Sequence, residues 1–64
     1  MKTTYLTKIR TKRKRMKLTQ RDMAELLEIK PLTYERLERG VTALTVDRLI
    51  KIAEVLKVKV KDLI

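Results

Sequence analysis

The side chains best suited to act on another molecule are cationic, amide and hydroxyl groups between Gln20 and Thr42 of this 64-residue chain. An arginine guanidinium can donate two parallel hydrogen bonds, either to an anion or to the O6 and N7 atoms of guanine. A glutamine at the start of a helix can bind a phosphate oxygen beside the unpaired backbone N–H groups of the first turn. These residue types favour recognition of a polyanion.

Catalytic chemistry has little support in the same sequence. The chain has no histidine, no cysteine and no glycine-rich loop that would hold a phosphate group. Glu25, Glu28, Glu35 and Glu38 are more simply solvated or paired with cations than arranged as an acid and a base. We therefore expect a protein that is not an enzyme and that needs no metal, no cofactor and no small-molecule ligand.

The charge balance indicates the class of partner. Seventeen lysines and arginines against eight acidic residues give a formal net charge of +9. This favours nucleic acid as the partner and an anionic membrane surface second, whereas simple solubility is the plainest alternative. The chain has no run of about 18 apolar residues that would span a membrane. Met1 to Arg15 lacks the apolar core of a secretion signal, so we expect a cytoplasmic protein without membrane contact.

The length and composition favour one small helical domain. A chain of this size forms a single domain at most, residues 1–64, with a core of aliphatic side chains. One glycine and one proline leave little material for the turns of a β fold, which indicates an all-α class. Met1 to Thr4 is expected to be disordered.

Two helices are predicted in the first half of the chain. The first includes the strongly basic segment Lys8 to Lys17, and a narrow stripe along it has helical spacing: Leu6, just before the segment, then Ile9, Arg13 and Met16. Thr19 is placed to cap the second helix, with Asp22 as a weaker partner than glutamate in a capping box. The buried face of the second helix is expected to hold Met23, Ala24, Leu26 and Leu27.

A turn at Glu28 to Lys30 separates the second helix from a third. Pro31 suits the first position of a helix, since the N–H that proline lacks would be unpaired there. We expect the third helix to continue to Arg39, with Tyr34 and Leu37 facing inward. The chain's one glycine follows directly and is placed to end this helix in a left-handed conformation.

A fourth helix is predicted after Thr45, which is placed to cap it. An apolar stripe at helical spacing runs along this helix: Val46, Leu49, Ile50, Ala53 and Leu56. Ile52 and Val55 lie off that stripe, so the helix is apolar on more than one side and is expected at the centre of the core. The tail from Val58 to Ile64 alternates like a strand but has no strand to pair with, which favours a short fifth helix from about Val60.

In this order, the segments resemble the helix-turn-helix domain of the phage Cro and repressor type, also called the xenobiotic-response-element family. The resemblance rests on the joint order and spacing of LTQ at Leu18–Gln20, MAELL at Met23–Leu27, Ile29, RLERG at Arg36–Gly40, LTVDRLIKIAEVL at Leu44–Leu56 and KDLI at Lys61–Ile64. It implies an all-α, compact five-helix domain of the lambda-repressor type. Helices 2 and 3 would form the helix-turn-helix, with helix 3 as the recognition helix.

The resemblance also implies an internal ion pair. In the family, an arginine at the position of Arg13 pairs with the glutamate at the position of Glu38, which would hold the first helix against the third. Arg13 shares its stripe with Ile9 and Met16, and this supports the pairing. In the alternative, both charges are solvated on the surface.

The chain departs from the family pattern around the turn and at two helix ends. Glu28 and Lys57 stand where glycine is frequent, so a left-handed backbone is expected there at a cost of about 1 kcal/mol. Lys30 replaces the usual serine or threonine cap of the third helix. Pro31 and Leu32 replace residues that are often polar base-readers, which leaves the base-reading scheme open.

Contacts with double-stranded DNA are expected along the third helix and at the start of the second. Arg36 is the strongest candidate for reading guanine, with a phosphate contact or a surface salt bridge as alternatives. Leu32 either presses on a thymine methyl group or is an exposed aliphatic, and Glu35 either accepts from cytosine or holds a neighbouring arginine. The family places a phosphate-binding glutamine at Gln20. The expected DNA contacts are Gln20, Arg21, Lys30, Pro31, Leu32, Thr33, Glu35, Arg36, Arg39 and Thr42, with Thr45 as a further candidate.

A weak homodimer that assembles on a two-fold DNA operator is expected, because a single small module binds DNA weakly. The family resemblance and the surplus of apolar residues place its interface at the C-terminal end. The interface residues would be Val58, Val60, Leu63 and Ile64, unless these four only close the core. The cationic cluster Lys12 to Lys17 either flanks the DNA or keeps the chain soluble.

The leading hypothesis is a sequence-specific transcriptional regulator, in particular a Cro-like repressor of a phage or mobile element. It would be a stand-alone regulator if these residues are the whole protein, and otherwise the N-terminal domain of a longer repressor. The alternative is an antitoxin-type interaction module that also binds DNA, an idea supported by the apolar Pro31 and Leu32. An RNA-binding or membrane-binding basic protein comes third; the lack of stacking aromatics and the compact helix pattern argue against these two.

Overall fold

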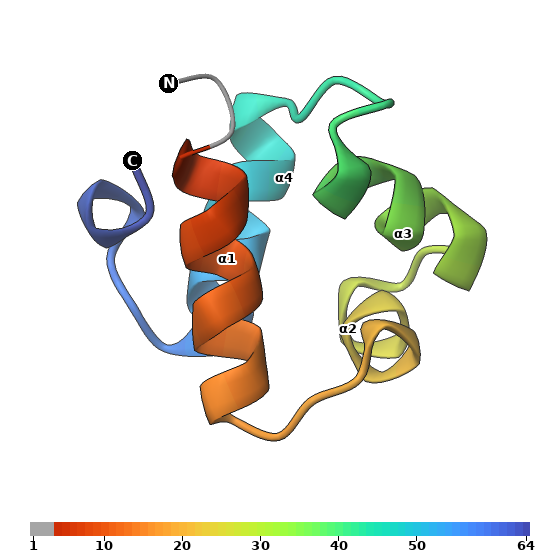
Figure 1. Ribbon diagram of the computed structural model, residues 1–64, viewed down its shortest axis with the longest axis horizontal. Helices are drawn as coiled ribbons and strands as arrows, with labels where there is room; N and C mark the ends of the chain where they lie inside the picture. Colours follow the sequence, from red (N-terminus) through yellow and green to blue (C-terminus); the bar gives the residue numbers. More distant parts are fainter. Residues whose placement is uncertain (1–3) are drawn as a thin grey trace.

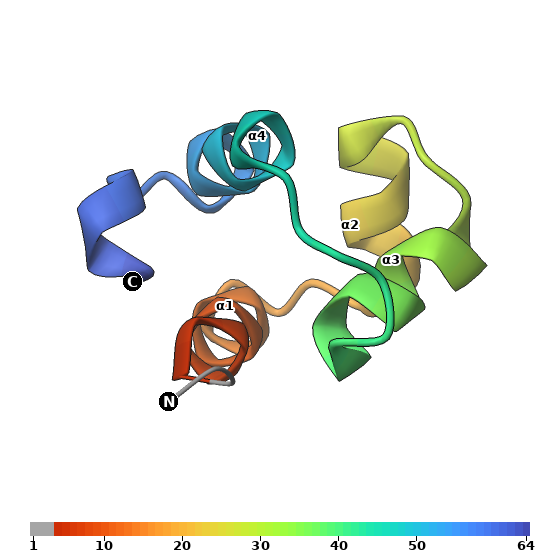
Figure 2. The same cartoon turned by 90° about the horizontal axis from the view of Figure 1, so that it is seen from above.

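The computed structural model describes residues 4–64, which form four α-helices and one 3-10 turn. Their bounds are α1 (Thr4–Arg15), α2 (Gln20–Leu27), α3 (Pro31–Arg39), α4 (Val46–Leu56) and η1 (Val60–Asp62). Helices α1 and α4 lie next to each other in the middle, with α2 and α3 on one side and η1 on the other (Figures 1 and 2). The described residues contain no strand, so the all-α prediction is confirmed for them.

Two expectations about the ends of the chain need correction. The expected fifth helix is only the 3-10 turn η1, because Leu63 N–H bonds back to the Val60 carbonyl at 2.9 Å and no longer helical ladder forms. Thr4, expected to be disordered, is the first residue of α1; the rest of that expectation, Met1 to Thr3, lies outside the described residues.

The helix-turn-helix segment begins and ends where the capping residues predict. Thr19 accepts a hydrogen bond from the backbone N–H of Asp22 at 3.0 Å, and the Asp22 carboxylate accepts one from the Thr19 N–H at 2.9 Å. The capping box is therefore complete, although aspartate is shorter than the usual glutamate. The hydrogen bond from the Thr19 N–H, together with the nearby Thr19 hydroxyl, stabilises the charged carboxylate and lowers the pKa of Asp22.

Among the described residues, four adopt the left-handed conformation that favours glycine. Only one of them is glycine: Gly40 has φ 78° after α3, and a Cβ added there would lie 3.2 Å from a methyl carbon of Leu6. Glu28 and Lys57 end α2 and α4 at φ 58° and 59°, as the departures from the family pattern predict. Lys17, at φ 59° in the connection between α1 and α2, was not expected.

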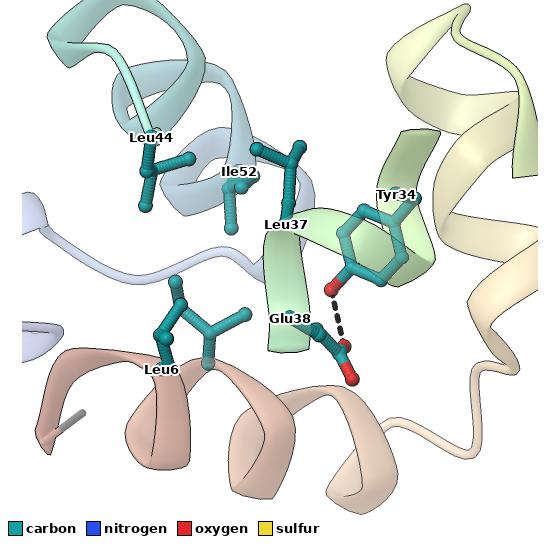
Figure 3. A pocket seen from close by; sticks show the side chains of 7 residues that line it. Leu6, Tyr34, Leu37, Glu38, Leu44 and Ile52 are labelled. Carbon is teal, nitrogen blue, oxygen red and sulfur yellow. Dashed lines mark hydrogen bonds between the residues drawn. The ribbon is translucent and has the colours of Figure 1, made fainter. Parts of the chain in front are cut away.

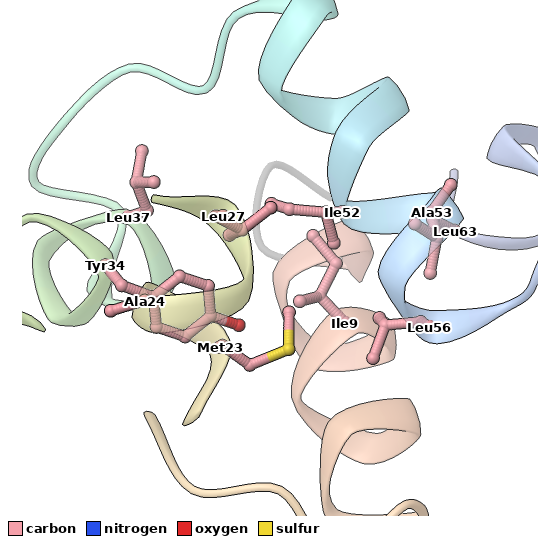
Figure 4. Packing of buried hydrophobic residues seen from close by; sticks show 10 residues of the cluster. All are labelled: Ile9, Met23, Ala24, Leu27, Tyr34, Leu37, Ile52, Ala53, Leu56 and Leu63. Atoms are coloured by element: carbon pink, nitrogen blue, oxygen red, sulfur yellow. The ribbon is translucent and has the colours of Figure 1, made fainter. Parts of the chain in front are cut away.

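The core gathers apolar side chains from all four α-helices and from the residue after η1 (Figure 4). Ala24 is fully buried, and its small side chain suits the close packing of α2 against α3. Tyr34 and Leu37 face inward as predicted. The buried cluster consists of Ile9, Met23, Ala24, Leu27, Tyr34, Leu37, Ile52, Ala53, Leu56 and Leu63.

The buried face of α2 is narrower than expected, and the buried face of α4 is rotated from its expected position. Leu26 is 55% exposed, because the narrow buried face of the short helix α2 is occupied by Met23, Ala24 and Leu27. Val46 and Ile50 are also exposed, whereas Ile52, expected off the stripe, is almost fully buried. Helix α4 thus packs against the core with the face that contains Ile52, Ala53 and Leu56. Met16 lies beyond the end of α1 and is partly exposed.

Glycine should stabilise this chain at positions where a charged residue has a left-handed backbone. Replacing Glu28 or Lys57 by glycine relieves steric strain and should raise the free energy of unfolding by about 1 kcal/mol. For a domain of this size, that corresponds to roughly 4–8 °C in Tm, measured by thermal melting. As a control, Lys51→Gly in the middle of α4 should lower stability by about 1 kcal/mol. Destabilisation by Glu28→Gly and Lys57→Gly would contradict the prediction.

Candidate nucleic-acid interface

A buried carboxylate lies at the junction of three helices. Glu38, in the last turn of α3, accepts a hydrogen bond from Arg13 Nε at 2.6 Å on Oε2 and one from Arg13 Nη2 at 3.3 Å on Oε1. Both side chains are more than nine-tenths buried. The third nitrogen of the same guanidinium, Nη1, donates to the carbonyl of Leu18 at 2.8 Å. Arg13 therefore connects α1 to α3 and also to the segment that leads into α2.

Three further side chains approach the same glutamate. The Tyr34 hydroxyl donates to Oε2 at 2.5 Å, one helical turn before Glu38 (Figure 3), and Gln20 Nε2 donates to Oε1 at 3.1 Å. Arg10 Nη2 donates to the backbone carbonyl of Glu38 at 3.1 Å, while its Nε lies 3.7 Å from Oε1. We refer to Glu38 with Arg10, Arg13, Gln20 and Tyr34 as the Glu38 network.

Sequence reasoning did not anticipate Arg10 or Tyr34 in this network. The signal was present in the spacing: Tyr34 and Glu38 are four residues apart on one helix, and Arg10 precedes Arg13 by three. Gln20 was expected to contact phosphate, and the resemblance gave no indication that its amide also bonds to Glu38. The remaining members, Arg13 and Glu38, are brought together in the geometry that the resemblance implies.

The network determines the charge states of its members. Burial alone would raise the pKa of Glu38, but hydrogen bonds from Arg13, Tyr34 and Gln20, with the positive charge of Arg13, lower that pKa overall. Burial and the hydrogen bond to the Glu38 carboxylate both raise the pKa of Tyr34, so the hydroxyl remains a donor. Within residues 4–64, no buried side-chain nitrogen or oxygen lacks a hydrogen-bond partner. The buried charge is therefore fully compensated.

The opposite face of α3 is open to solvent. Lys30, Pro31, Leu32 and Arg36 are exposed, and Thr33 is half-buried. Pro31 is the first residue of the helix, as predicted, and Lys30 precedes it without a side-chain cap. The first turn of α3 therefore presents unpaired backbone N–H groups beside a cationic side chain. That combination attracts anions.

The charged residues of α3 differ in whether they form an ion pair within the described part of the protein. Glu35 accepts a hydrogen bond from Arg39 at 3.1 Å, so its carboxylate holds the neighbouring arginine. The Arg36 guanidinium forms no ion pair with any carboxylate of residues 4–64. Its guanidinium is thus available to another molecule.

The other expected contact residues surround this helix. Arg21 is exposed in the first turn of α2, beside the half-buried Gln20. Thr42 is exposed in the loop after α3. The Thr45 hydroxyl accepts a hydrogen bond from the backbone N–H of Arg48 at 3.2 Å, which makes it the cap of α4. Figure 2 shows α2 and α3 together on one side of the α1–α4 pair, away from η1.

A hollow of about 410 Å³ lies between the end of α2 and the start of α4, lined by Leu27, Glu28, Ile29, Thr45, Asp47, Arg48 and Lys51. The space between Leu6, Tyr34, Leu37 and Leu44 has no room for a water molecule (Figure 3). In residues 4–64, no three acidic, histidine or cysteine side chains lie close enough to hold a metal ion. The chemistry of this surface therefore rests on exposed cations, amides and backbone N–H groups.

A family model described as helix-turn-helix matches residues 9–63 of the chain. The chain belongs to the helix-turn-helix family of the Cro and repressor type. The family comprises DNA-binding domains of transcription regulators and is not a family of enzymes. A search of curated proteins and a search of solved structures gave no match. Among the described residues, no helix combines the length and the apolar character needed to cross a membrane.

Truncation of the buried arginine should be strongly destabilising. Arg13→Ala leaves the Glu38 charge buried without its main partner, which costs about 3–5 kcal/mol. The matched control is Arg39→Ala, which breaks the exposed Glu35–Arg39 pair and should cost less than about 1 kcal/mol. Urea unfolding of both variants measures the difference. Equal effects would show that Arg13 is no more important to the fold than a surface arginine.

The pKa shifts predict how stability depends on pH. Because the pKa of Glu38 is below its ordinary 4.5, its stabilising effect is complete above that value and is lost as pH falls through the lowered pKa. Because the pKa of Tyr34 is above its ordinary 10.0, its contribution is complete below pH 10 and is lost at higher pH. Urea unfolding across acid pH should show a flatter profile for Glu38→Gln. Glu35→Gln, at a more exposed carboxylate, should keep the wild-type slope, and an unchanged profile in Glu38→Gln would exclude Glu38 as the source.

Proposed function

We propose that this protein is a sequence-specific repressor of the Cro type, from a phage or mobile element, which inserts α3 into the major groove of its operator. The observation that carries this proposal is the contrast between the two faces of α3. One face is fixed by the buried Glu38, and the other leaves Arg36 exposed and without an ion pair to any of residues 4–64. A rigidly held helix with a free guanidinium is suited to reading base edges.

The proposed reading scheme assigns different roles along α3. Arg36 reads guanine through its O6 and N7 atoms, and Leu32, which is about half exposed, packs on a thymine methyl group. Thr33 and Pro31 lie beside the bases and contribute shape complementarity. Glu35 orients Arg39, consistent with the 3.1 Å bond between them, rather than accepting from cytosine.

Phosphate contacts are proposed at the edges of this surface. Gln20 uses one amide hydrogen to reach Glu38, which orients the side chain and leaves its other amide hydrogen for a phosphate oxygen. The first turn of α2 adds unpaired backbone N–H groups at the same point. Cationic or hydroxyl groups that complete the set are Arg21, Lys30, Arg39 and Thr42.

A two-fold dimer would place two copies of α3 in successive major grooves. Of the expected interface residues, Leu63 is fully buried inside the protomer and is therefore withdrawn from this role. Ile64 is 65% exposed, and Val58 and Val60 are half-buried against the core. The proposed interface is centred on Ile64, with these two valines beside it.

Binding to the DNA upstream of its own coding region tests the proposal. At about 150 mM salt, the protein should bind this duplex more tightly than a scrambled duplex of equal length, with two protomers per two-fold site. Fluorescence anisotropy measures the affinity, and sedimentation on DNA measures the stoichiometry. Equal affinity for both duplexes would contradict a specific repressor. It would favour the antitoxin alternative, in which Pro31 and Leu32 contact a protein.

Two arginines should respond differently to truncation. Arg36→Ala should cost about 1–3 kcal/mol on the operator and relax the preference at one base pair, because it removes a base contact. Arg21→Ala should weaken binding to all sequences alike, because a phosphate contact carries no sequence information. Competition with operators mutated singly at each base pair measures both. A uniform loss in Arg36→Ala would make Arg36 a phosphate contact.

A further inference from the structure

Helix α1 carries a concentration of positive charge that its structural role does not explain. It contains no acidic residue, its last turn, Lys12 to Arg15, is cationic at every position, and Lys17 follows in the connection to α2. Arg13 is buried in the Glu38 network, and Arg10 contacts the same glutamate. Lys14 and Lys17 are exposed, and neither forms an ion pair within residues 4–64.

Apart from the buried Arg13, lysines and arginines of α1 lie on two sides of the helix. Arg10 bonds to Glu38, so its side of the helix faces α3, and Lys14 follows four residues later on that same side. Lys17 lies two residues past the end of α1, in the connection to α2, where its backbone is left-handed. Lys8 donates to the carbonyl of Ile64 at 3.0 Å, so its side faces the C-terminal segment. Lys12 follows Lys8 by four residues on this second side.

The α3-facing side of α1 begins next to the proposed phosphate site of α2. Oxygen Oε1 of Glu38 accepts from Gln20 at 3.1 Å and lies 3.7 Å from Arg10 Nε. These two side chains therefore converge on one atom. The start of α2 and the α3-facing side of α1 thus form one continuous surface of hydrogen-bond donors and cations.

We propose that Arg10, Lys14 and Lys17 form a second phosphate-binding surface for double-stranded DNA, outside the helix-turn-helix itself. This inference rests on the proposed function, because it extends the path of the DNA backbone from Gln20 onto α1. The charges oppose those of the backbone, and the contacts read no sequence. This surface raises the affinity for operator and non-operator DNA by the same factor.

The surface fits a nucleic acid better than a membrane. An interfacial helix needs an apolar face that enters the lipid, and on α1 that face consists of Leu6 and Ile9, which are buried in the core. Opening it would unfold the domain. The exposed part of the proposed surface offers charge alone, which suits the regular phosphates of a duplex.

Matched pairs of neutral substitutions test the proposal in the full chain. Lys14→Gln with Lys17→Gln removes two charges from the proposed surface, and Lys8→Gln with Lys12→Gln removes two charges from the other side of α1. Affinities are measured over a range of salt, with the upstream duplex and a scrambled duplex. Urea unfolding checks that both variants fold, and vesicles containing anionic lipid serve as a second probe.

Each phosphate contact contributes about 0.9 to the slope of log K against log salt. The first variant should therefore lower the slope by about two on both duplexes, and the Lys8–Lys12 variant by clearly less than one. Equal changes in the two variants would overturn the proposal in favour of bulk charge. The proposal would also be overturned by an unchanged slope, by a loss of affinity for one duplex only, or by a loss of vesicle binding without a change in DNA affinity. Failure of the proposed function differs from all of these, because wild-type protein would then not distinguish the duplexes at all.

Discussion

The orientation of three helices depends on the compensation of one buried charge. Glu38 would be costly in the core without partners, and Arg13, Tyr34 and Gln20 supply hydrogen bonds to its two oxygens. Each donor comes from a different position in the fold: α1, the interior of α3 and the start of α2. The buried carboxylate keeps all of these hydrogen bonds only while the three elements hold their relative positions. Apolar packing alone would allow more freedom, because a network of directed hydrogen bonds is satisfied in few arrangements.

This constraint connects stability with DNA binding. Gln20 belongs to the network and also stands at the proposed phosphate site, while Arg36 projects from the helix that Glu38 holds. The proposed phosphate contact of Gln20 and the proposed base contact of Arg36 thus both lie on helices rather than on loops, which favours precise docking. The chain retains strained backbone at Glu28 and Lys57, on the ends of α2 and α4. That strain lies in the helix ends and leaves the network unaffected.

Local signals in the sequence were sufficient for the caps of α2, α3 and α4, and the family resemblance implied the pairing of Arg13 with Glu38. Pro31 and Gly40 predicted the bounds of α3 because each has a fixed backbone preference. The sequence did not show which face of α4 is buried, because its apolar residues lie on two faces of the helix. Only tertiary packing selects the face with Ile52. Leu26 was misplaced because the buried face of the short helix α2 is narrow. The spacing of Tyr34 and Glu38 on α3 allows their contact, whereas the contact of Arg10 with Glu38 also depends on where α1 and α3 meet.

If Glu38 organises the DNA-binding surface, the starts of α2 and α3 are the part of the protein that meets DNA. Chemical-shift mapping of the ¹⁵N-labelled protein during titration with its operator duplex measures this. The largest shifts are expected at Gln20 and Arg21 and from Lys30 to Arg36, with little change in η1 away from a dimer contact at Ile64. Shifts centred on the exposed side of α4, at Val46 and Ile50, with an unaffected α3 would contradict this expectation.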